Sequence, residues 1–334
     1  MSVQEVIVQT PSRLHFALID LNGSLGRIDG SVGMALDRPG FRIRLQRRLR
    51  TISIEGDKAG PFTDRIDDII EIMKERFGIR REFNLSGVKV IVEEVIPPHM
   101  GLGSGTQISL AIAHGFARLY GFELSREEAS SLVGRGGTSG IGVTAFYEGG
   151  FILDGGHRFP DQKSSYLPSS ASKGVSPPPV IFRRNFPEDW KLLIVLPPGR
   201  HISGDEEVRL FTSLCPVPVS EIERTSHIIL MEMLPALMER DLERFGDAID
   251  RIQKVGWKRV EVEAQDEVVR ETMRFLKREG ALGVGLSSWG PALYALSHDP
   301  ESLLERTKKF LNSLPEGGIC FLAGPNNSGA FISG

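Results

Sequence analysis

The stretch "PPHMGLGSGTQ", residues 97–107, joins the run "GVKVIVEEVI" (87–96) to an apolar segment that begins at Ile108. Glycines stand at positions 101, 103 and 105, and hydroxyl residues stand at 104 and 106. Glycine allows positive φ and a close approach of the backbone to a phosphate, and the N-terminus of a helix attracts anions. The stretch therefore predicts a strand, a phosphate-holding loop and a helix. A tight strand-to-helix turn with an ordinary cap is the alternative that these residues leave open.

The helix after this loop has the clearest pattern in the chain. Ile108, Ile112 and Phe116 are four residues apart, and Gly121 stops the pattern. Ser104 and Gln107 have the spacing of a capping box, as do Ser125 and Glu128 before a shorter helix. No Gly-Lys-Ser/Thr follows and the spacing is not G-x-G-x-x-G, so neither a P-loop nor a Rossmann loop is predicted.

The rest of the chain predicts an α+β protein with two domains. Short β-type runs fill residues 5–56, a helix with Asp64 as its cap covers 64–78, and residues 138–156 predict a glycine-rich turn and a hairpin. Residues 158–180 lose apolar periodicity and are rich in Ser and Pro, which predicts a linker or a mobile loop. Residues 181–334 are mostly helical with a few strands. We therefore expect an N-terminal domain over 1–157 and a C-terminal domain over 181–334.

Composition excludes several classes of protein. The net charge of −3 over 334 residues gives no electrostatic footprint for nucleic acid. The N-terminus lacks the basic and apolar regions of a signal peptide, and no apolar run is long enough to span a bilayer. The two cysteines, Cys215 and Cys320, are far apart in apolar surroundings and are expected to be buried free thiols. These features predict a soluble cytoplasmic protein.

Three segments resemble motifs of the GHMP kinase superfamily. Residues 97–105 match its phosphate-binding motif, P-x-x-x-G-L-G-S-G. "TPSRLHFALIDLNG" (10–23) lies where that superfamily has its N-terminal substrate motif, and "GLSSWGPALYAL" (285–296) is similar to its C-terminal glycine motif. The resemblance implies a ribosomal-S5-like N-terminal domain, a ferredoxin-like C-terminal domain and a site in the cleft between them.

One position departs from the kinases of this superfamily. They often carry an aspartate in an S-G-I-D segment, where a carboxylate orients or deprotonates the hydroxyl to be phosphorylated. This chain reads "TSGIGV", with Gly142 at that place. The loss weighs against phosphoryl transfer to a hydroxyl.

The sequence of the N-terminal segment is similar to that of a non-kinase branch of the superfamily. This branch is the β-ribofuranosylaminobenzene 5′-phosphate synthases of methanopterin biosynthesis in archaea and methylotrophs. Residues 13–29, 134–157 and 196–207 carry this second resemblance. It implies a decarboxylating transferase that condenses phosphoribosyl pyrophosphate (PRPP) with a para-substituted benzoate. Pyrophosphate and CO₂ leave, Mg²⁺ accompanies PRPP, and the enzyme is a homodimer acting on small molecules. The residues do not decide between 4-hydroxybenzoate and 4-aminobenzoate.

The resemblance and the chemistry together select candidate residues. Asp20, Arg27 and His15 are the catalytic candidates, and Asp20 and Asp29 are the candidate Mg²⁺ ligands because Mg²⁺ prefers hard oxygen. Arg27 is the first choice for the 5′-phosphate or the benzoate carboxylate. The expected substrate- and phosphate-binding residues are Arg13, Asn22, Gly101, Gly103, Ser104, Gly105, Thr106, Gln107, Arg200, Ser287, Trp289 and Gly290.

Plainer interpretations remain open for several of these residues. Arg13 and His15 share one face of a strand, which could simply be solvated. Asp20 and Asn22 could be turn formers beside Gly23. Trp289 could belong to the core or to a lid. For the whole chain, the alternatives are an ATP-dependent small-molecule kinase and a non-catalytic regulator that binds a nucleotide or a phosphosugar.

Overall fold

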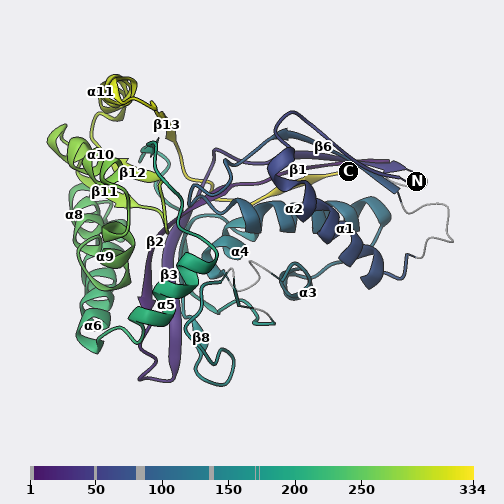
Figure 1. The fold of residues 1–334 in the computed structure, drawn as a ribbon, viewed down its shortest axis with the longest axis horizontal. Helices are drawn as coiled ribbons and strands as arrows, with labels where there is room; N and C mark the ends of the chain where they lie inside the picture. The colour runs from purple at the N-terminus through teal and green to yellow at the C-terminus, as the bar shows by residue number, and fades with distance from the viewer. Residues whose placement is uncertain (1–3, 49–50, 80–86, 135–138, 170, 173) are drawn as a thin grey trace.

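The computed structural model describes residues 1–334 except 1–3, 49–50, 80–86, 135–138, 170 and 173 (Figure 1). The N-terminal half holds β1 (Glu5–Gln9), β2 (Ser12–Asp20), β3 (Arg27–Leu36), β4 (Arg42–Arg48), β5 (Ile52–Glu55), η1 (Gly60–Phe62), α1 (Thr63–Arg76), β6 (Gly87–Glu94), α2 (Ser104–Tyr120), α3 (Arg126–Leu132), α4 (Gly140–Tyr147), β7 (Phe151–Asp154) and β8 (His157–Arg158). The rest holds β9 (Val180–Arg184), β10 (Leu192–Leu196), α5 (Asp205–Leu214), α6 (Val219–Ile228), η2 (Ile229–Met233), α7 (Leu234–Glu239), α8 (Leu242–Ile252), α9 (Gly256–Glu263), α10 (Glu267–Arg278), β11 (Gly283–Leu286), β12 (Leu293–Leu296), α11 (Pro300–Ser313), β13 (Ile319–Ala323) and β14 (Phe331–Ser333). The mixture of antiparallel sheets and helices confirms the predicted α+β class.

Three sheets form the frame. The first has the order β14-β1-β4-β6-β5, the second β2-β3-β7-β9 with β8 paired to β3, and the third β11-β12-β10-β13. All strand pairs are antiparallel except β5 with β6. The long β2–β3 hairpin runs between the helices of the two halves in Figure 1, and it contacts α4 on one side and α9 on the other. The hairpin therefore carries its side chains into the region where the two halves meet.

The C-terminal sheet separates two cores by the alternation of its side chains. Leu192, Ile194 and Leu196 of β10 pack into the large core shared with α8, while Leu193 and Val195 face α10 and α11 in a second core. Successive side chains of a strand point to opposite faces, so a continuous apolar run is what a sheet covered on both sides requires.

Helix α2 is the centre of the N-terminal half. It packs against α1, α4, β1 and β4, and its apolar residues are almost fully buried. At Gly115 a Cβ would stand 2.6 Å from Leu45 Cδ1, so the absence of a side chain lets the helix lie close to the sheet.

Several local predictions were wrong. Residues 140–147 form the helix α4 and not a hairpin, because this helix is buried nearly all round and so has no polar face to give a helical period. The residue before α1 is Phe62, so Asp64 lies in the first turn and is not the cap. The capping box of Ser125 and Glu128 is confirmed at α3.

Two segments beyond residue 180 return to the N-terminal half. β9 pairs with β7, and β14 pairs with β1 beside the start of the chain. Within the described residues, no helix is long and apolar enough to cross a membrane. The two cysteines are free and half-buried.

Candidate functional site

The glycine loop leads into the N-terminus of α2 as predicted, with a different cap. Gly103, at φ 82°, is the residue before the helix, and no side chain caps it. The predicted capping box of Ser104 and Gln107 is therefore wrong. The side chain of Gln107 instead donates to the carbonyl of Gly142 (2.8 Å). A helix start without a side-chain cap leaves backbone N–H groups for a ligand.

The glycines of the loop have distinct roles. At Gly101 (φ 78°) a Cβ would lie 2.3 Å from the carbonyl oxygen of Ser287, and at Gly103 it would lie 2.8 Å from Cγ of Arg13. At Gly105 nothing lies within 4 Å of the Cβ position, and this residue lines the cleft. The first two glycines allow close packing, and the third keeps the helix N-terminus open.

Hydrogen bonds join the three segments that the sequence singled out. Ser287 Oγ donates to the carbonyl of Gly101 (2.7 Å) and accepts from the backbone N–H of His15 (3.1 Å). Arg13 donates to the same Gly101 carbonyl (2.5 Å), and its backbone N–H donates to Leu102 (3.0 Å). The N-terminal strand, the glycine loop and the 287–290 turn therefore form one structure.

The cleft has an outer part at this loop. Its lining includes Arg13, Arg65, His99, His201 and the start of α2, and Glu207 is the one acidic residue among its described lining residues. Arg13 is half-buried, and its Nε is buried with no hydrogen-bond partner among the described groups. Burial lowers the pKa of Arg13 to about 10, so the side chain stays cationic at neutral pH. An unpaired buried donor with a positive charge favours an anion in the outer part.

The inner part of the cleft continues from the outer part and shares Arg13, Ser169, Glu207, Ser288 and Trp289 with it. The apolar walls are Leu18, Leu167, Phe211 and Trp289. Trp289 is 3% exposed and lies edge-on to Trp257, so it belongs to a packed cluster as well as to the wall.

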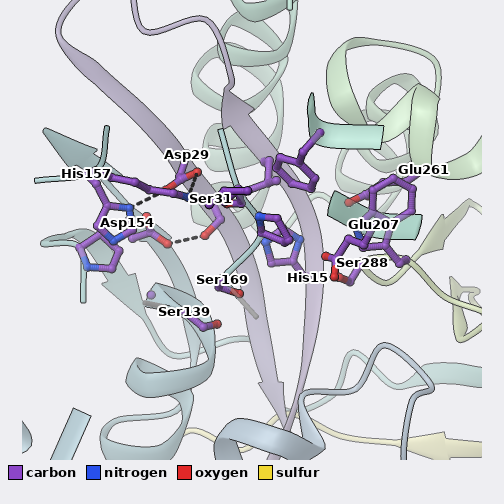
Figure 2. A pocket seen from close by; sticks show the side chains of 18 of the residues that line it. His15, Asp29, Ser31, Ser139, Asp154, His157, Ser169, Glu207, Glu261 and Ser288 are labelled. Carbon is purple, nitrogen blue, oxygen red and sulfur yellow. Dashed lines mark hydrogen bonds and ion pairs between the residues drawn. The ribbon is translucent and has the colours of Figure 1, made fainter. Parts of the chain in front are cut away.

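His15 lies in the middle of the inner part (Figure 2). A β-bulge after His15 shifts the register of β2, so that Arg13, His15 and then Leu18 face the cleft. Burial, followed by the charges of Arg13 and Lys258, holds the pKa of His15 well below its usual value. A neutral imidazole is therefore expected at this position, and its Nδ1 has no partner among the described groups.

A charged cluster closes the inner end (Figure 2). Asp29, at φ 68° on β3, lies 2.5 Å from His157 Nδ1 and within 2.9–3.0 Å of Lys163 Nζ. Burial alone would raise the pKa of Asp29, but the hydrogen bond from His157 and the charge of Lys163 lower it below its ordinary value. Asp29 is thus an ionised carboxylate with both oxygens occupied by protein groups.

Asp154 stands beside this cluster. It accepts hydrogen bonds from Ser31 Oγ and from the backbone N–H of Gly156. Burial raises its pKa to about 6. A Cβ at Gly140 would lie 2.3 Å from Asp154 Oδ2, so the glycine of the "SGIG" segment makes room for this carboxylate.

Helix α9 adds a buried ion pair at the other end of the inner part. Lys258 and Glu261 contact each other and are almost completely buried, and Lys258 also donates to the carbonyl of Leu286 (3.1 Å). Burial lowers the pKa of Lys258 and raises that of Glu261. Glu261 lines the cleft close to Arg13.

Some predicted site residues lie outside the cleft lining. Asp20 Oδ1 accepts the backbone N–H groups of Asn22 (2.7 Å) and Gly23 (3.0 Å), so it shapes the hairpin turn. Arg27 donates to the carbonyls of Gly155 and Gly156 (2.7 and 2.6 Å). Arg200 is 56% exposed and pairs with Glu206 and Asp266. Asn22 also lies outside the lining, and its Nδ2 donates to the carbonyl of Val217 (2.7 Å). Three further predicted residues are not lining residues either: Gln107, Ser287 and Gly290. The other predicted residues line the cleft.

The described residues do not fit a resident Mg²⁺ site on Asp20 and Asp29. Asp29 is taken up by Lys163 and His157, and one oxygen of Asp20 binds the hairpin turn. No group of three or more His, Cys, Asp or Glu that could hold a metal occurs within the part of the chain that the structure describes.

The described part of 158–180 packs over the cleft. Lys163 is 5% exposed and donates to the carbonyl of Leu167 (2.6 Å), and Tyr166 donates to the carbonyl of Asn22 (2.5 Å). Leu167 and Pro168 form part of the inner wall.

Sequence reasoning missed Lys163, Asp154, Arg65, Lys258 and Glu261. The pair on α9 has a weak signal in the i,i+3 spacing of a cation and an anion, which is also typical of exposed helices. The others come from separate elements, and no local pattern marks them.

The fold and the sequence of this chain match those of the GHMP kinases. Sequence models of the GHMP kinases N terminal domain and of the GHMP kinases C terminal domain match residues 65–150 and 233–313. Homoserine kinase from Cytophaga hutchinsonii (TM-score 0.68, 16% identity, 100% of this chain and 98% of that one) and mevalonate kinase from Methanococcus jannaschii (TM-score 0.68, 15% identity, 96% and 98%) share the fold. The predicted two-domain GHMP-type fold is confirmed.

Relatives with higher sequence identity show to which family of GHMP-type proteins the chain belongs. The chain is 39% identical to β-ribofuranosylphenol 5′-phosphate synthase of Methanocaldococcus jannaschii, over 97% of this chain and 99% of that protein. It is 41% identical to the protein of the same name from Methanothermobacter thermautotrophicus, over 99% of both. The chain belongs to the β-ribofuranosylphenol 5′-phosphate synthase family, which confirms the predicted branch.

Proposed function

We propose that this protein joins C1 of the PRPP ribose to the ring of 4-hydroxybenzoate, giving β-ribofuranosylphenol 5′-phosphate with loss of pyrophosphate and CO₂. The observation that carries the proposal is the relationship over nearly the full chain to proteins named for this product. The word phenol in their names favours 4-hydroxybenzoate over 4-aminobenzoate as the acceptor. We place the reaction in methanopterin biosynthesis, because that is the pathway that the family resemblance implies.

The shape of the cleft supports this chemistry. The outer part offers the N-terminus of α2 and the buried cation of Arg13 to a diphosphate, and stabilisation of a leaving polyanion is a main source of catalysis in such a reaction. The inner part has apolar walls, including Trp289 and Phe211, against which an aromatic ring can pack. The ring carbon that bears the carboxylate would face the ribose where the two parts meet.

We propose that Mg²⁺ arrives on the diphosphate of PRPP. The carboxylates first expected to bind it are engaged with protein groups, whereas a substrate diphosphate supplies hard oxygen ligands of its own. The test is the Mg²⁺ dependence of PRPP binding. We expect tight Mg²⁺ binding in the presence of PRPP and weak binding to the protein alone, by titration calorimetry.

The deciding experiment is release of CO₂ from carboxyl-labelled 4-hydroxybenzoate and 4-aminobenzoate with PRPP and Mg²⁺, with ATP in place of PRPP as a control. Release that depends on PRPP, faster with 4-hydroxybenzoate, is the expected result. Arg13→Met should lower kcat/KM for PRPP by about 10- to 150-fold, because a charge-assisted hydrogen bond is worth roughly 1.5–3 kcal/mol. Arg200→Met, at an exposed arginine outside the cleft, is the matched control and should leave the rate unchanged.

Thermal unfolding with added ligands, read together with the CO₂ assay, separates the alternatives of a kinase and of a non-catalytic binder. A ligand that binds only the folded state raises its apparent stability. PRPP with Mg²⁺ should therefore raise the melting temperature more than ATP does. Stabilisation by ATP, ADP formation with a metabolite panel and no CO₂ release would refute the synthase proposal.

We also propose that the protein works as a cytoplasmic homodimer, as the family resemblance implies. Light scattering on the purified protein tests the dimer, and a mass of one chain would refute it.

A further inference from the structure

The inner end of the cleft holds a histidine whose two ring nitrogens have different surroundings. His157 Nδ1 lies 2.5 Å from Asp29 Oδ2, and the side chain is 2% exposed (Figure 2). No described group forms a hydrogen bond with Nε2, although this atom is buried and its residue lines the cleft. A buried polar atom without a partner is destabilising, and a bound ligand with a hydrogen-bond donor would satisfy it.

The surroundings of His157 determine which nitrogen carries the proton. An ionised carboxylate can only accept, and Lys163 keeps Asp29 ionised by contacting both of its oxygens. The Nδ1 of neutral His157 therefore donates to Asp29, and Nε2 is left with its lone pair. When Nε2 takes up a proton, the carboxylate of Asp29 stabilises the resulting cation.

The other polar groups of the inner part are less suited to accept a proton from a ligand. Asp154 already accepts from Ser31 and from a backbone N–H. His15 lies nearer to the outer part, beside the cations Arg13 and Lys258, which disfavour its protonated form. Beside His157 the cleft lining holds two carboxylates, Asp29 and Asp154, and the cation Lys163, and Arg27 donates to the backbone carbonyls of the two residues before His157.

We propose that His157 Nε2 is the general base that takes the proton of the acceptor's 4-hydroxyl. The inference rests on the proposed function. In the acceptor the hydroxyl is para to the carbon that forms the new bond, so the two groups point in opposite directions. If that carbon faces the ribose at the junction of the two parts, the hydroxyl points toward the inner end, where Asp29, Asp154 and His157 lie.

Loss of this proton is what the reaction requires of its acceptor. A phenolate is more electron-rich at the para carbon than a phenol is, and that carbon attacks ribose C1 as the bond from C1 to pyrophosphate breaks. The adduct is a cyclohexadienone that carries the ribosyl and carboxylate groups on one carbon. The bond to the carboxylate then breaks, CO₂ leaves, and its electron pair restores the aromatic ring. The phenolate oxygen takes its proton back from His157, so the base is regenerated.

The test compares two acceptors in wild type and in His157→Asn, whose shorter amide can still reach toward Asp29 but offers no basic group at the Nε2 position. With 4-hydroxybenzoate, we expect kcat to fall by roughly 10²- to 10⁴-fold, the usual contribution of a general base. With 3,5-difluoro-4-hydroxybenzoate, whose hydroxyl is already largely ionised at neutral pH, the deficit should shrink to less than about tenfold. The KM for PRPP should change little in either case.

His114→Asn is the matched control, because His114 is a half-buried histidine outside the cleft that contacts Tyr147. It should lower kcat equally and only slightly for both acceptors. Equal deficits of His157→Asn with both acceptors, in an active wild type, would refute the role of His157 and leave the proposed function standing. Absence of PRPP-dependent CO₂ release by wild type would refute both.

A measurement on wild type alone covers the case in which His157→Asn does not fold. The rates with the two acceptors should depend differently on pH, because the hydroxyl of 4-hydroxybenzoate must lose its proton to His157 whereas that of the difluoro acceptor is already ionised at neutral pH. Superimposable pH profiles for the two acceptors would overturn the proposal.

Discussion

Replacement of Gly105 by alanine should stabilise the fold and damage the site. Gly105 is the second residue of α2, its φ is not positive, and no atom lies within 4 Å of the Cβ position. Alanine in a helix is favoured over glycine by about 0.5–1 kcal/mol, and nothing in the structure opposes the new methyl group. We therefore expect the free energy of unfolding to rise by about 0.5–1 kcal/mol in Gly105→Ala.

The same methyl group stands in the outer part of the cleft, where the backbone N–H groups of α2 would meet the diphosphate. Loss of one charge-assisted hydrogen bond through this obstruction costs roughly 1.5–3 kcal/mol. At 1.4 kcal/mol per factor of ten, the KM for PRPP should rise about 10- to 150-fold. The KM for the aromatic acceptor should change much less.

Urea unfolding of the protein without ligands measures the first effect, and steady-state CO₂ release at varied PRPP measures the second. Gly60→Ala is the matched control, because a Cβ there also meets nothing within 4 Å and Gly60 lies outside the cleft lining. It should leave the KM for PRPP unchanged. An unchanged KM in Gly105→Ala would refute the placement of the diphosphate, and a loss of stability would refute the account of Gly105 as a residue kept for ligand access.

Three further predictions concern the buried polar groups of the cleft. Ser287→Ala leaves the backbone N–H of His15 without its acceptor, so urea unfolding should show a loss of roughly 1–3 kcal/mol; a loss below 0.5 kcal/mol, on the order of a surface substitution, would contradict it. Lys258→Met leaves Glu261 buried without its cation and should cost roughly 3–5 kcal/mol, whereas Lys258→Met combined with Glu261→Gln should cost less; a double variant that loses as much stability as Lys258→Met, or more, would contradict this account. Because burial raises the pKa of Asp154 to about 6, the folded state binds more protons than the unfolded state between about pH 4 and 6. The stability of wild type relative to Asp154→Asn should therefore fall by up to about 3 kcal/mol as the pH rises through this window, and a constant difference between the two proteins would refute the raised pKa.

The sequence allowed the glycine loop and its helix to be predicted because their signals are local. Positive φ at Gly101 and Gly103 and the apolar stripe of α2 depend on neighbours in the chain. The cap at Gly103 was missed because Ser104 and Gln107 have the right spacing for a capping box. In the folded chain Ser104 lines the cleft, and the side chain of Gln107 donates to the carbonyl of Gly142. The helix α4 was missed because burial on all sides removes the polar face that a helical pattern needs.

The candidate site was predicted where it depended on motifs and missed where it depended on contacts. Arg13, His15 and Ser287 stand in recognisable segments, and the structure joins them by hydrogen bonds. Asp20 and Arg27 stand in an equally polar segment, yet their side chains bind the backbone of turns. The difference comes from the β-bulge after His15 and the turn at the end of the hairpin, whose effect on side-chain direction is not visible in residue types.

By itself the sequence determined the family and the place of the phosphate loop, because both depend on short stretches of neighbouring residues. The tertiary structure alone decided the composition of the inner end. Four side chains from separate places in the chain meet there: Asp29 of β3, Asp154 of β7, His157 of β8 and Lys163 of the following segment. Burial raises the pKa of Asp154, whereas the contacts with His157 and Lys163 lower that of Asp29. Nε2 of His157 is buried with no partner among the described groups. These effects arise only in the packed chain, and no local pattern contains them.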